Sequence, residues 1–156
     1  MKNKIFVGLL AVAICELVGV AGAVFTTPAI ATWYAGLIKA PLNPPNWIFG
    51  PVWATLFALM GVAGYLVWRR RKEKTVAWAL AFFALQLVLN VLWSYLFFGL
   101  HAPAFAAIEI VAFWFSILWT AVEFAKVSRP AAALMVPYLL WVSFAVYLNY
   151  AVVVLN

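Results

Sequence analysis

Five apolar stretches, each about twenty residues long, account for most of this chain, and their length constrains the fold more than any other feature. A helix rises about 1.5 Å per residue, so about twenty residues cross the roughly 30 Å hydrocarbon layer of a membrane. The sequence therefore predicts an all-α polytopic membrane protein, one domain over residues 1–156 that forms a bundle of five transmembrane helices. We expect the spans at Ile5–Val24, Asn46–Trp68, Val76–Phe98, Ala104–Phe124 and Pro130–Val153.

The composition excludes the other broad classes of protein. Of the 156 residues, 69% are hydrophobic and 9% are charged, so too few polar side chains exist to cover a water-soluble domain. The apolar runs are uninterrupted, whereas a membrane β-barrel needs short strands of alternating polarity. Helices satisfy their own backbone groups in lipid, and they are the remaining solution.

The positive charges predict which way the bundle faces. When the five spans are threaded across a membrane, all but one of the 10 Lys and Arg residues fall on the N-terminal side, and the exception is Lys39. Cytoplasmic loops carry the excess of Lys and Arg, so we expect a cytoplasmic N-terminus and an extracytoplasmic C-terminus, in a prokaryotic cell membrane. The run Arg69–Lys72 then meets anionic lipid headgroups, and a nucleic-acid partner is not expected.

The first span has two open interpretations. Met1–Lys4, an apolar run and the small residues Ala21–Ala23 are also typical of a secretory signal peptide. The run is longer than a usual signal core and Glu16 interrupts it, which favours a retained helix. Small residues recur along this span and the second one, and they indicate close helix packing within the chain or, alternatively, a homodimer seam. These residues are Ala11, Cys15, Gly19, Ala23, Gly61 and Gly64.

Only the first connection between spans is long, from residue 25 to residue 45. It carries Trp33 and Tyr34 together with several prolines, which stiffen the backbone and oppose regular helix. Long connections in compact domains are commonly functional. We therefore expect residues 25–45 to form a lid on the extracytoplasmic side.

Aromatic and amide side chains from several spans fall at similar depths beneath this loop. Within each span they recur every three or four residues, which aligns them on one helix face. Amides are costly to expose to lipid, so these faces should point into the bundle. The candidate ligand-binding residues from the spans are Phe49, Trp53, Asn90, Trp93, Trp141, Ala145 and Asn149. For Asn90, a purely structural hydrogen bond to another helix is an equal alternative.

Catalytic and metal-binding constellations are not predicted. The single histidine, His101, lies in a short loop and the single cysteine, Cys15, lies within a span, so no nucleophile–base couple or zinc site can be assembled. Glu16 and Glu109 are expected to be protonated or hydrogen-bonded without chemistry, a proton relay being the alternative. A tryptophan-lined apolar space with a few amides suits a flat, hydrophobic, π-rich ligand, with no cofactor required.

Several collinear motifs resemble the TspO/MBR family, which comprises tryptophan-rich sensory proteins and translocator proteins (peripheral benzodiazepine receptors). In the first loop and second span these are Trp33-Tyr34, Asn43-Pro44-Pro45, Trp47, Phe49-Gly50-Pro51, Trp53 and Met60-Gly61. In the third and fifth spans they are Gln86-Leu87, Leu89-Asn90, Leu92-Trp93-Ser94, Phe97-Phe98-Gly99, Pro137-Tyr138-Leu139, Trp141, Phe144-Ala145 and Leu148-Asn149.

The resemblance implies five transmembrane helices, homodimers, and binding of porphyrins such as protoporphyrin IX, of sterols and of drug-like benzodiazepine-site ligands. It implies a sensory, regulatory or transport role in tetrapyrrole metabolism or stress. The implied pocket residues are Trp53, Asn90, Trp93, Trp141 and Ala145, with Trp33 and Tyr34 in the lid. Light-dependent porphyrin degradation is an alternative activity, for which Trp53 and Trp141 would be the catalytic residues.

The chain departs from the family pattern at two places. Leu42 stands where the family's loop carries a tryptophan, which lowers the expectation that this position stacks on a ligand. No Lys or Arg follows Tyr147 or Tyr150, as a cholesterol-binding pattern at the end of the fifth span would require. Sterol binding is accordingly a weaker expectation than porphyrin binding.

Overall fold

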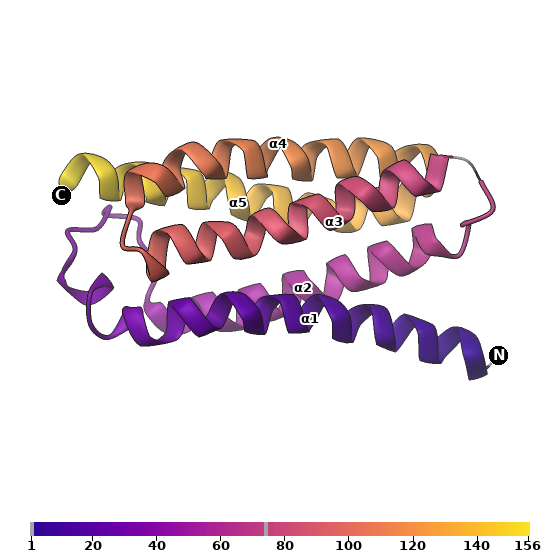
Figure 1. The fold of residues 1–156 in the computed structure, drawn as a ribbon, viewed down its shortest axis with the longest axis horizontal. Helices are drawn as coiled ribbons and strands as arrows, with labels where there is room; N and C mark the ends of the chain where they lie inside the picture. Colours follow the sequence, from indigo (N-terminus) through magenta and orange to yellow (C-terminus); the bar gives the residue numbers. More distant parts are fainter. Residues whose placement is uncertain (1, 74) are drawn as a thin grey trace.

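A computed structural model describes residues 2–73 and 75–156 and contains five long helices (Figure 1). They are α1 (Lys2–Ile30), α2 (Asn46–Trp68), α3 (Thr75–Ser94), α4 (Pro103–Val127) and α5 (Arg129–Leu155). Each is long and apolar enough to cross a membrane, and the described residues contain no strand. The prediction of an all-α, five-helix membrane protein is confirmed.

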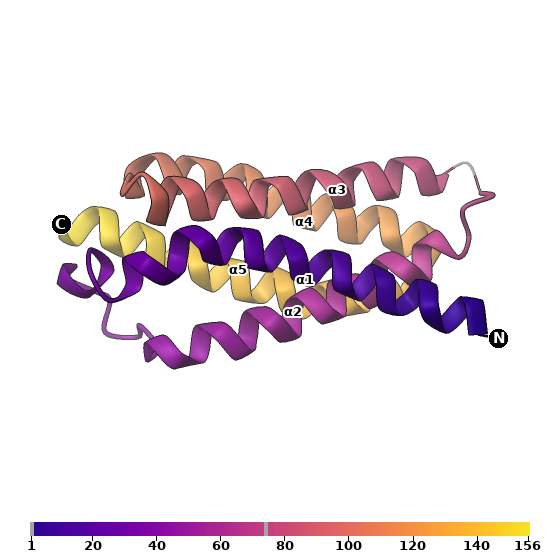
Figure 2. The ribbon, with the colours of Figure 1, turned by 60° about the horizontal axis from the view of Figure 1, so that its bottom comes forward.

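The helices form two groups that lie against each other. The most extensive helix contacts join α4 to α5, α3 to α4, and α1 to α2. Figure 1 shows the N-terminus and the α2–α3 connection at one end of the bundle, with the C-terminus and the α1–α2 connection at the other. In Figure 2, α1 and α2 separate toward the second end.

The predicted end of the first helix is wrong. We expected the span to stop at Val24 and the lid to cover residues 25–45, but α1 continues through Pro28 to Ile30. A proline lacks one backbone donor, and transmembrane helices tolerate the loss of this single hydrogen bond. The Thr26 hydroxyl donates to the carbonyl of Gly22 (3.1 Å). The connection is therefore residues 31–45, with a short 3-10 turn, η1 (Tyr34–Gly36).

The second and third helices fit their predicted spans closely. The bounds of α2 match the prediction at both ends. α3 is followed by a π-helical turn, η2 (Tyr95–Gly99), in which the Leu100 amide donates to the carbonyl of Tyr95 (2.8 Å). His101 then takes a positive φ of 52°, which turns the chain sharply into α4.

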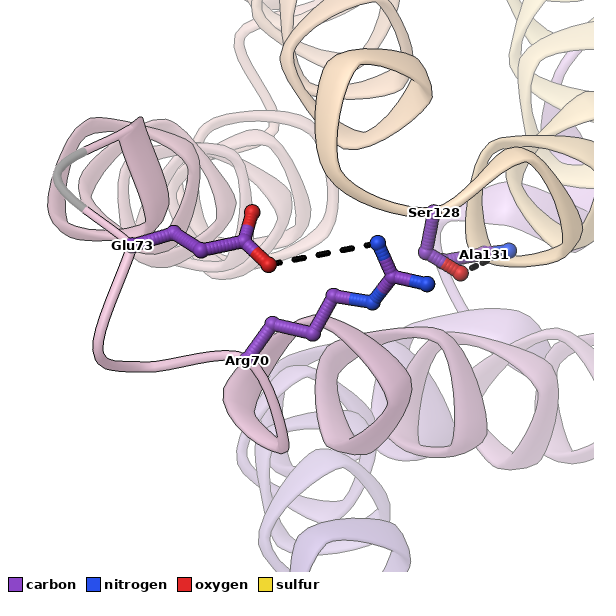
Figure 3. Close-up of polar contacts among 4 residues, drawn as sticks. All are labelled: Arg70, Glu73, Ser128 and Ala131. Carbon is purple, nitrogen blue, oxygen red and sulfur yellow. Dashed lines mark hydrogen bonds and ion pairs between the residues drawn. The ribbon is translucent and has the colours of Figure 1, made fainter.

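The end of the bundle near the N-terminus carries most of the charge. Figure 3 shows the Arg70 guanidinium 3.9 Å from the Glu73 carboxylate in the α2–α3 connection. Only Ser128 separates α4 from α5, and its hydroxyl accepts a hydrogen bond from the Ala131 amide (3.5 Å), which caps α5. Which side of a membrane this end faces stays a prediction from the charges.

Small residues allow α1 and α2 to cross closely within one chain. A Cβ atom added at Gly61 would lie 2.4 Å from the Val12 Cα atom and 3.0 Å from the carbonyl oxygen of Ala11. A Cβ atom added at Gly19 would similarly lie 2.6 Å from ring carbons of Phe57. These glycines serve packing inside the bundle, where lipid provides little hydrophobic drive for association.

A chain of buried hydrogen bonds crosses the middle of the bundle. The Asn90 amide nitrogen donates to the Tyr138 hydroxyl (3.0 Å), which donates to Gln86 Oε1 (2.9 Å). The Gln86 amide nitrogen lies 3.8 Å from the Met60 sulfur. Because α2, α3 and α5 each contribute to this chain, it fixes their relative register.

Gly61→Ala should destabilise the bundle, because the new methyl group meets helix backbone that cannot move aside. We expect a loss of roughly 1–3 kcal/mol in unfolding free energy, measured by thermal unfolding in detergent. Gly50→Ala is the matched control on the same helix, since an added Cβ there meets nothing within 4 Å. Equal melting temperatures for the two variants would contradict the close crossing.

Tyr138→Phe should destabilise the bundle while preserving the ring. Removing the hydroxyl leaves the amides of Asn90 and Gln86 without their partner, at a cost of roughly 1–3 kcal/mol. Thermal unfolding measures the effect, with Tyr147→Phe on the same helix as control because that side chain is 41% exposed. A wild-type melting temperature for Tyr138→Phe would show that the buried chain contributes nothing.

Candidate functional site

A cavity of about 450 Å³ lies at the end of the bundle that carries the α1–α2 connection. Its walls come from α1, η1, α2, the end of α3 with η2, and α5. The volume lies within the range of about 300–1,000 Å³ typical of small-molecule sites. The aromatic lining residues are Tyr34, Trp47, Phe49, Trp53, Phe57, Trp93, Phe97, Phe98, Trp141 and Phe144.

The structure brings together all of the sequence-predicted site residues except Trp33. Tyr34, Phe49, Trp53, Asn90, Trp93, Trp141, Ala145 and Asn149 all line the cavity. Trp33 instead stacks on the His101 ring, with centroids 4.4 Å apart and planes 9° apart, and packs edge-on against Phe97 at 5.5 Å. It supports the lid and the α3–α4 link from outside the cavity.

The wall formed by α2 and α5 is built from interlocking aromatic rings. The Phe49 ring lies edge-on to Trp141, with centroids 5.9 Å apart, and Trp53 lies edge-on to Tyr138 at 6.2 Å. Trp53 also contacts Phe57 at 5.7 Å. Such ring pairs favour edge-on and offset geometries, so these contacts hold the two tryptophans in place beside the cavity.

Asn149 positions the wall contributed by α3. Its Oδ1 atom accepts a hydrogen bond from the Trp93 indole N–H (3.0 Å), and its Nδ2 atom donates to the carbonyl of Pro103 (2.9 Å). Trp93 also stacks on Phe97 in the π-helical turn, with centroids 5.2 Å apart. Asn149 therefore locks the indole orientation and ties α5 to the start of α4.

The α1–α2 connection covers the cavity and is held at several points. Buried Tyr34 donates its hydroxyl hydrogen to Asn43 Oδ1 (2.9 Å), and burial raises the pKa of this phenol, so it stays protonated at neutral pH. The Asn156 side chain accepts from the Ile38 amide (2.9 Å) and donates to its carbonyl (3.0 Å). The connection is thereby fastened to the end of α5.

Lys39 and Leu42 take no part in lining the cavity. The Lys39 ammonium donates to the carbonyls of Leu37 (3.0 Å) and Ala35 (3.3 Å) and lies over the Tyr34 ring. Leu42, at the position of the family's loop tryptophan, is 68% exposed. The connection thus borders the cavity through Tyr34. The Lys39 ammonium and the Leu42 side chain are not part of the lining.

Sequence reasoning missed the contribution of α1. Gly19, Gly22 and Ala23 form a wall of small side chains, with Glu16 at its deep end. A small-residue stripe predicts close packing but does not reveal that part of it faces a cavity. Periodicity alone places Glu16 on a helix face, and no feature of the sequence shows what that face meets.

Trp47 also lines the cavity, although its place near a span end is typical of an interfacial aromatic. Its side chain is 74% exposed, so it borders the opening rather than the interior. On α1, Val20 lines the cavity and is 59% exposed. The cavity is therefore bordered by outward-facing positions on α1 and α2, the two helices that separate at this end (Figure 2).

The second intramembrane acid lies elsewhere. Both carboxyl oxygens of Glu109 on α4 are buried and have no hydrogen-bond partner among the described residues. Glu109 does not line the cavity. Within residues 2–73 and 75–156 no three His, Cys, Asp or Glu side chains come together as a metal site. The arrangement of the cavity suits binding of an apolar aromatic molecule.

Comparison with known proteins identifies the family that the sequence motifs resemble. Residues 11–155 match the model of the TspO/MBR family. The tryptophan-rich protein TspO of Chlorobaculum tepidum is 42% identical, over 100% of this chain and 99% of its own length. The translocator protein of Bos taurus is 40% identical over 86% of this chain and 81% of its own, and the tryptophan-rich sensory protein of Cereibacter sphaeroides is 36% identical over 86% and 85%. The chain is an integral membrane protein that belongs to the TspO/MBR family.

Proposed function

We propose that this protein binds porphyrins of the protoporphyrin IX type, and related flat hydrophobic molecules, in the cavity beneath the α1–α2 connection. Binding would serve a sensory or regulatory role in tetrapyrrole metabolism or stress. The observation that carries the proposal is the aromatic lining, in which Trp53 and Trp141 border an apolar space of about 450 Å³. One relative bears the name tryptophan-rich sensory protein, which supports the sensory part.

The physical chemistry of the lining suits a tetrapyrrole. Aromatic faces stack on a flat π-system, and apolar walls remove its large surface from water and lipid headgroups. α1 contributes Gly19, Gly22 and Ala23 to the lining, and the two glycines let Phe57 and Ser94 pack closely against the helix. The lid and the opening between α1 and α2 would let the polar edge of the ligand reach the membrane surface.

Transport of porphyrins or other amphipathic metabolites is a second candidate. The cavity is bordered by outward-facing residues at its sides, which supports exchange with the bilayer. Below it, Met60, Gln86 and Tyr138 are fully buried and close the bundle. A closed floor favours capture over passage. Porphyrin flux in proteoliposomes distinguishes the two, since binding without flux is expected.

Light-dependent porphyrin degradation is the third candidate, supported by the presence of both Trp53 and Trp141 in one cavity. Trp53→Phe and Trp141→Phe preserve aromatic walls but remove the indoles. If illumination of the bound porphyrin yields product at the wild-type rate in both variants, the protein hosts photochemistry without supplying catalytic residues.

Trp53→Ala, Trp141→Ala and Asn90→Ala should each weaken protoporphyrin IX binding by about tenfold, because each removes part of the cavity wall. Titration of the porphyrin absorption band in detergent measures the affinity without relying on tryptophan fluorescence. Trp119→Ala is the matched control, since Trp119 lies on α4 outside the cavity and is 53% exposed. Unchanged affinity in all three cavity variants would remove the cavity as the binding site.

A further inference from the structure

Glu16 differs from every other residue that lines the cavity. It carries the one charged group in that lining, and its side chain is half-buried. The ion pairs of residues 2–73 and 75–156 join Arg70 to Glu73 and Lys126 to Glu123, and Glu16 takes part in neither. The sequence predicted a carboxyl that is protonated or hydrogen-bonded without a role, but the structure leaves it facing the cavity with no partner among these residues.

Glu16 lies at the end of the cavity that is farthest from the α1–α2 connection. Among the α1 residues in the lining it lies farthest from the lid, about one helical turn below Gly19. Gly19 itself abuts Phe57, the deepest lining residue of α2. A planar ligand that fills the cavity to this depth would therefore meet the Glu16 carboxyl.

Two of the other polar side chains in the lining are engaged at both ends or by a neighbour in the protein. Tyr34 donates to Asn43 (2.9 Å), and Asn149 uses both ends of its amide, toward Trp93 and Pro103. The carboxyl of Glu16 is left as an uncommitted acceptor. An unpaired carboxyl in an apolar space is costly, and a hydrogen bond from a ligand would reduce that cost.

We propose, building on the porphyrin-binding function, that Glu16 determines ligand specificity by accepting hydrogen bonds from nitrogen-bound hydrogens of the ligand. In a free-base tetrapyrrole these hydrogens lie in the ring plane and point toward the ring centre, so an acceptor can approach them only from above the ring face. A metal-loaded tetrapyrrole has lost them. A carboxyl accepts hydrogen bonds whether or not it is ionised, so the free base is preferred in either charge state of Glu16. The site is therefore selective for free-base rings.

The test compares protoporphyrin IX with its nickel(II) complex, whose metal is held square-planar by the four ring nitrogens. Both ligands keep the same periphery and carboxylates. For the wild-type protein we expect the free base to bind about tenfold more tightly, a factor typical of one hydrogen bond to a charged or polar group. Glu16→Ala should reduce this ratio to about one, and Glu16→Gln, which keeps a neutral acceptor, should give an intermediate ratio.

Glu109→Gln is the matched control, because it alters the other deep intramembrane acid without touching the cavity. It should keep the wild-type ratio. A wild-type ratio of one, or a ratio that Glu16→Ala leaves unchanged, overturns the role of Glu16 while porphyrin binding stands. If neither porphyrin binds the wild-type protein, the proposed function itself fails and the selectivity fails with it.

Discussion

The absence of water from the bilayer interior is the constraint on which this structure depends. Backbone groups must bond within each helix, so the described residues form five long helices, and only the α1–α2 connection is long. Polar side chains must find partners inside the bundle for the same reason. The hydrogen bonds among Asn90, Tyr138 and Gln86 are one result, and the bonds that Asn149 makes to Trp93 and Pro103 are another. Each set joins helices that are distant in sequence.

These paired groups also define the cavity. The buried chain through Tyr138 lies beneath it, and Asn149 holds the Trp93 indole at its side. Above it, Asn156 and Asn43 fasten the α1–α2 connection. A hollow persists because rigid, hydrogen-bonded elements surround it, while α1 contributes several small residues to the wall. Glu16 is the one charged residue in this lining, and its carboxyl takes part in neither ion pair of the described residues, so it is available to a ligand.

Much of this arrangement could be predicted from the sequence, because membrane thickness fixes helix length and helical periodicity fixes faces. The bounds of α2 and the convergence of residues such as Trp53, Asn90 and Trp141 follow from those two rules. Contacts between helices do not follow from them. Neither rule predicts that α1 extends through Pro28 to Ile30, or that Trp33 stacks on His101 outside the cavity. The sequence did not predict that Glu16 lines the cavity, because periodicity does not show which helix faces border a cavity.

The most direct test of the central claim is an experimental structure of the protein in lipid nanodiscs with protoporphyrin IX bound. Our account predicts a ring seated between the small-residue wall of α1 and the indoles of Trp53 and Trp141, with the α1–α2 connection above it. A porphyrin bound on an outward, lipid-facing surface, with the cavity empty or filled by side chains, would contradict it.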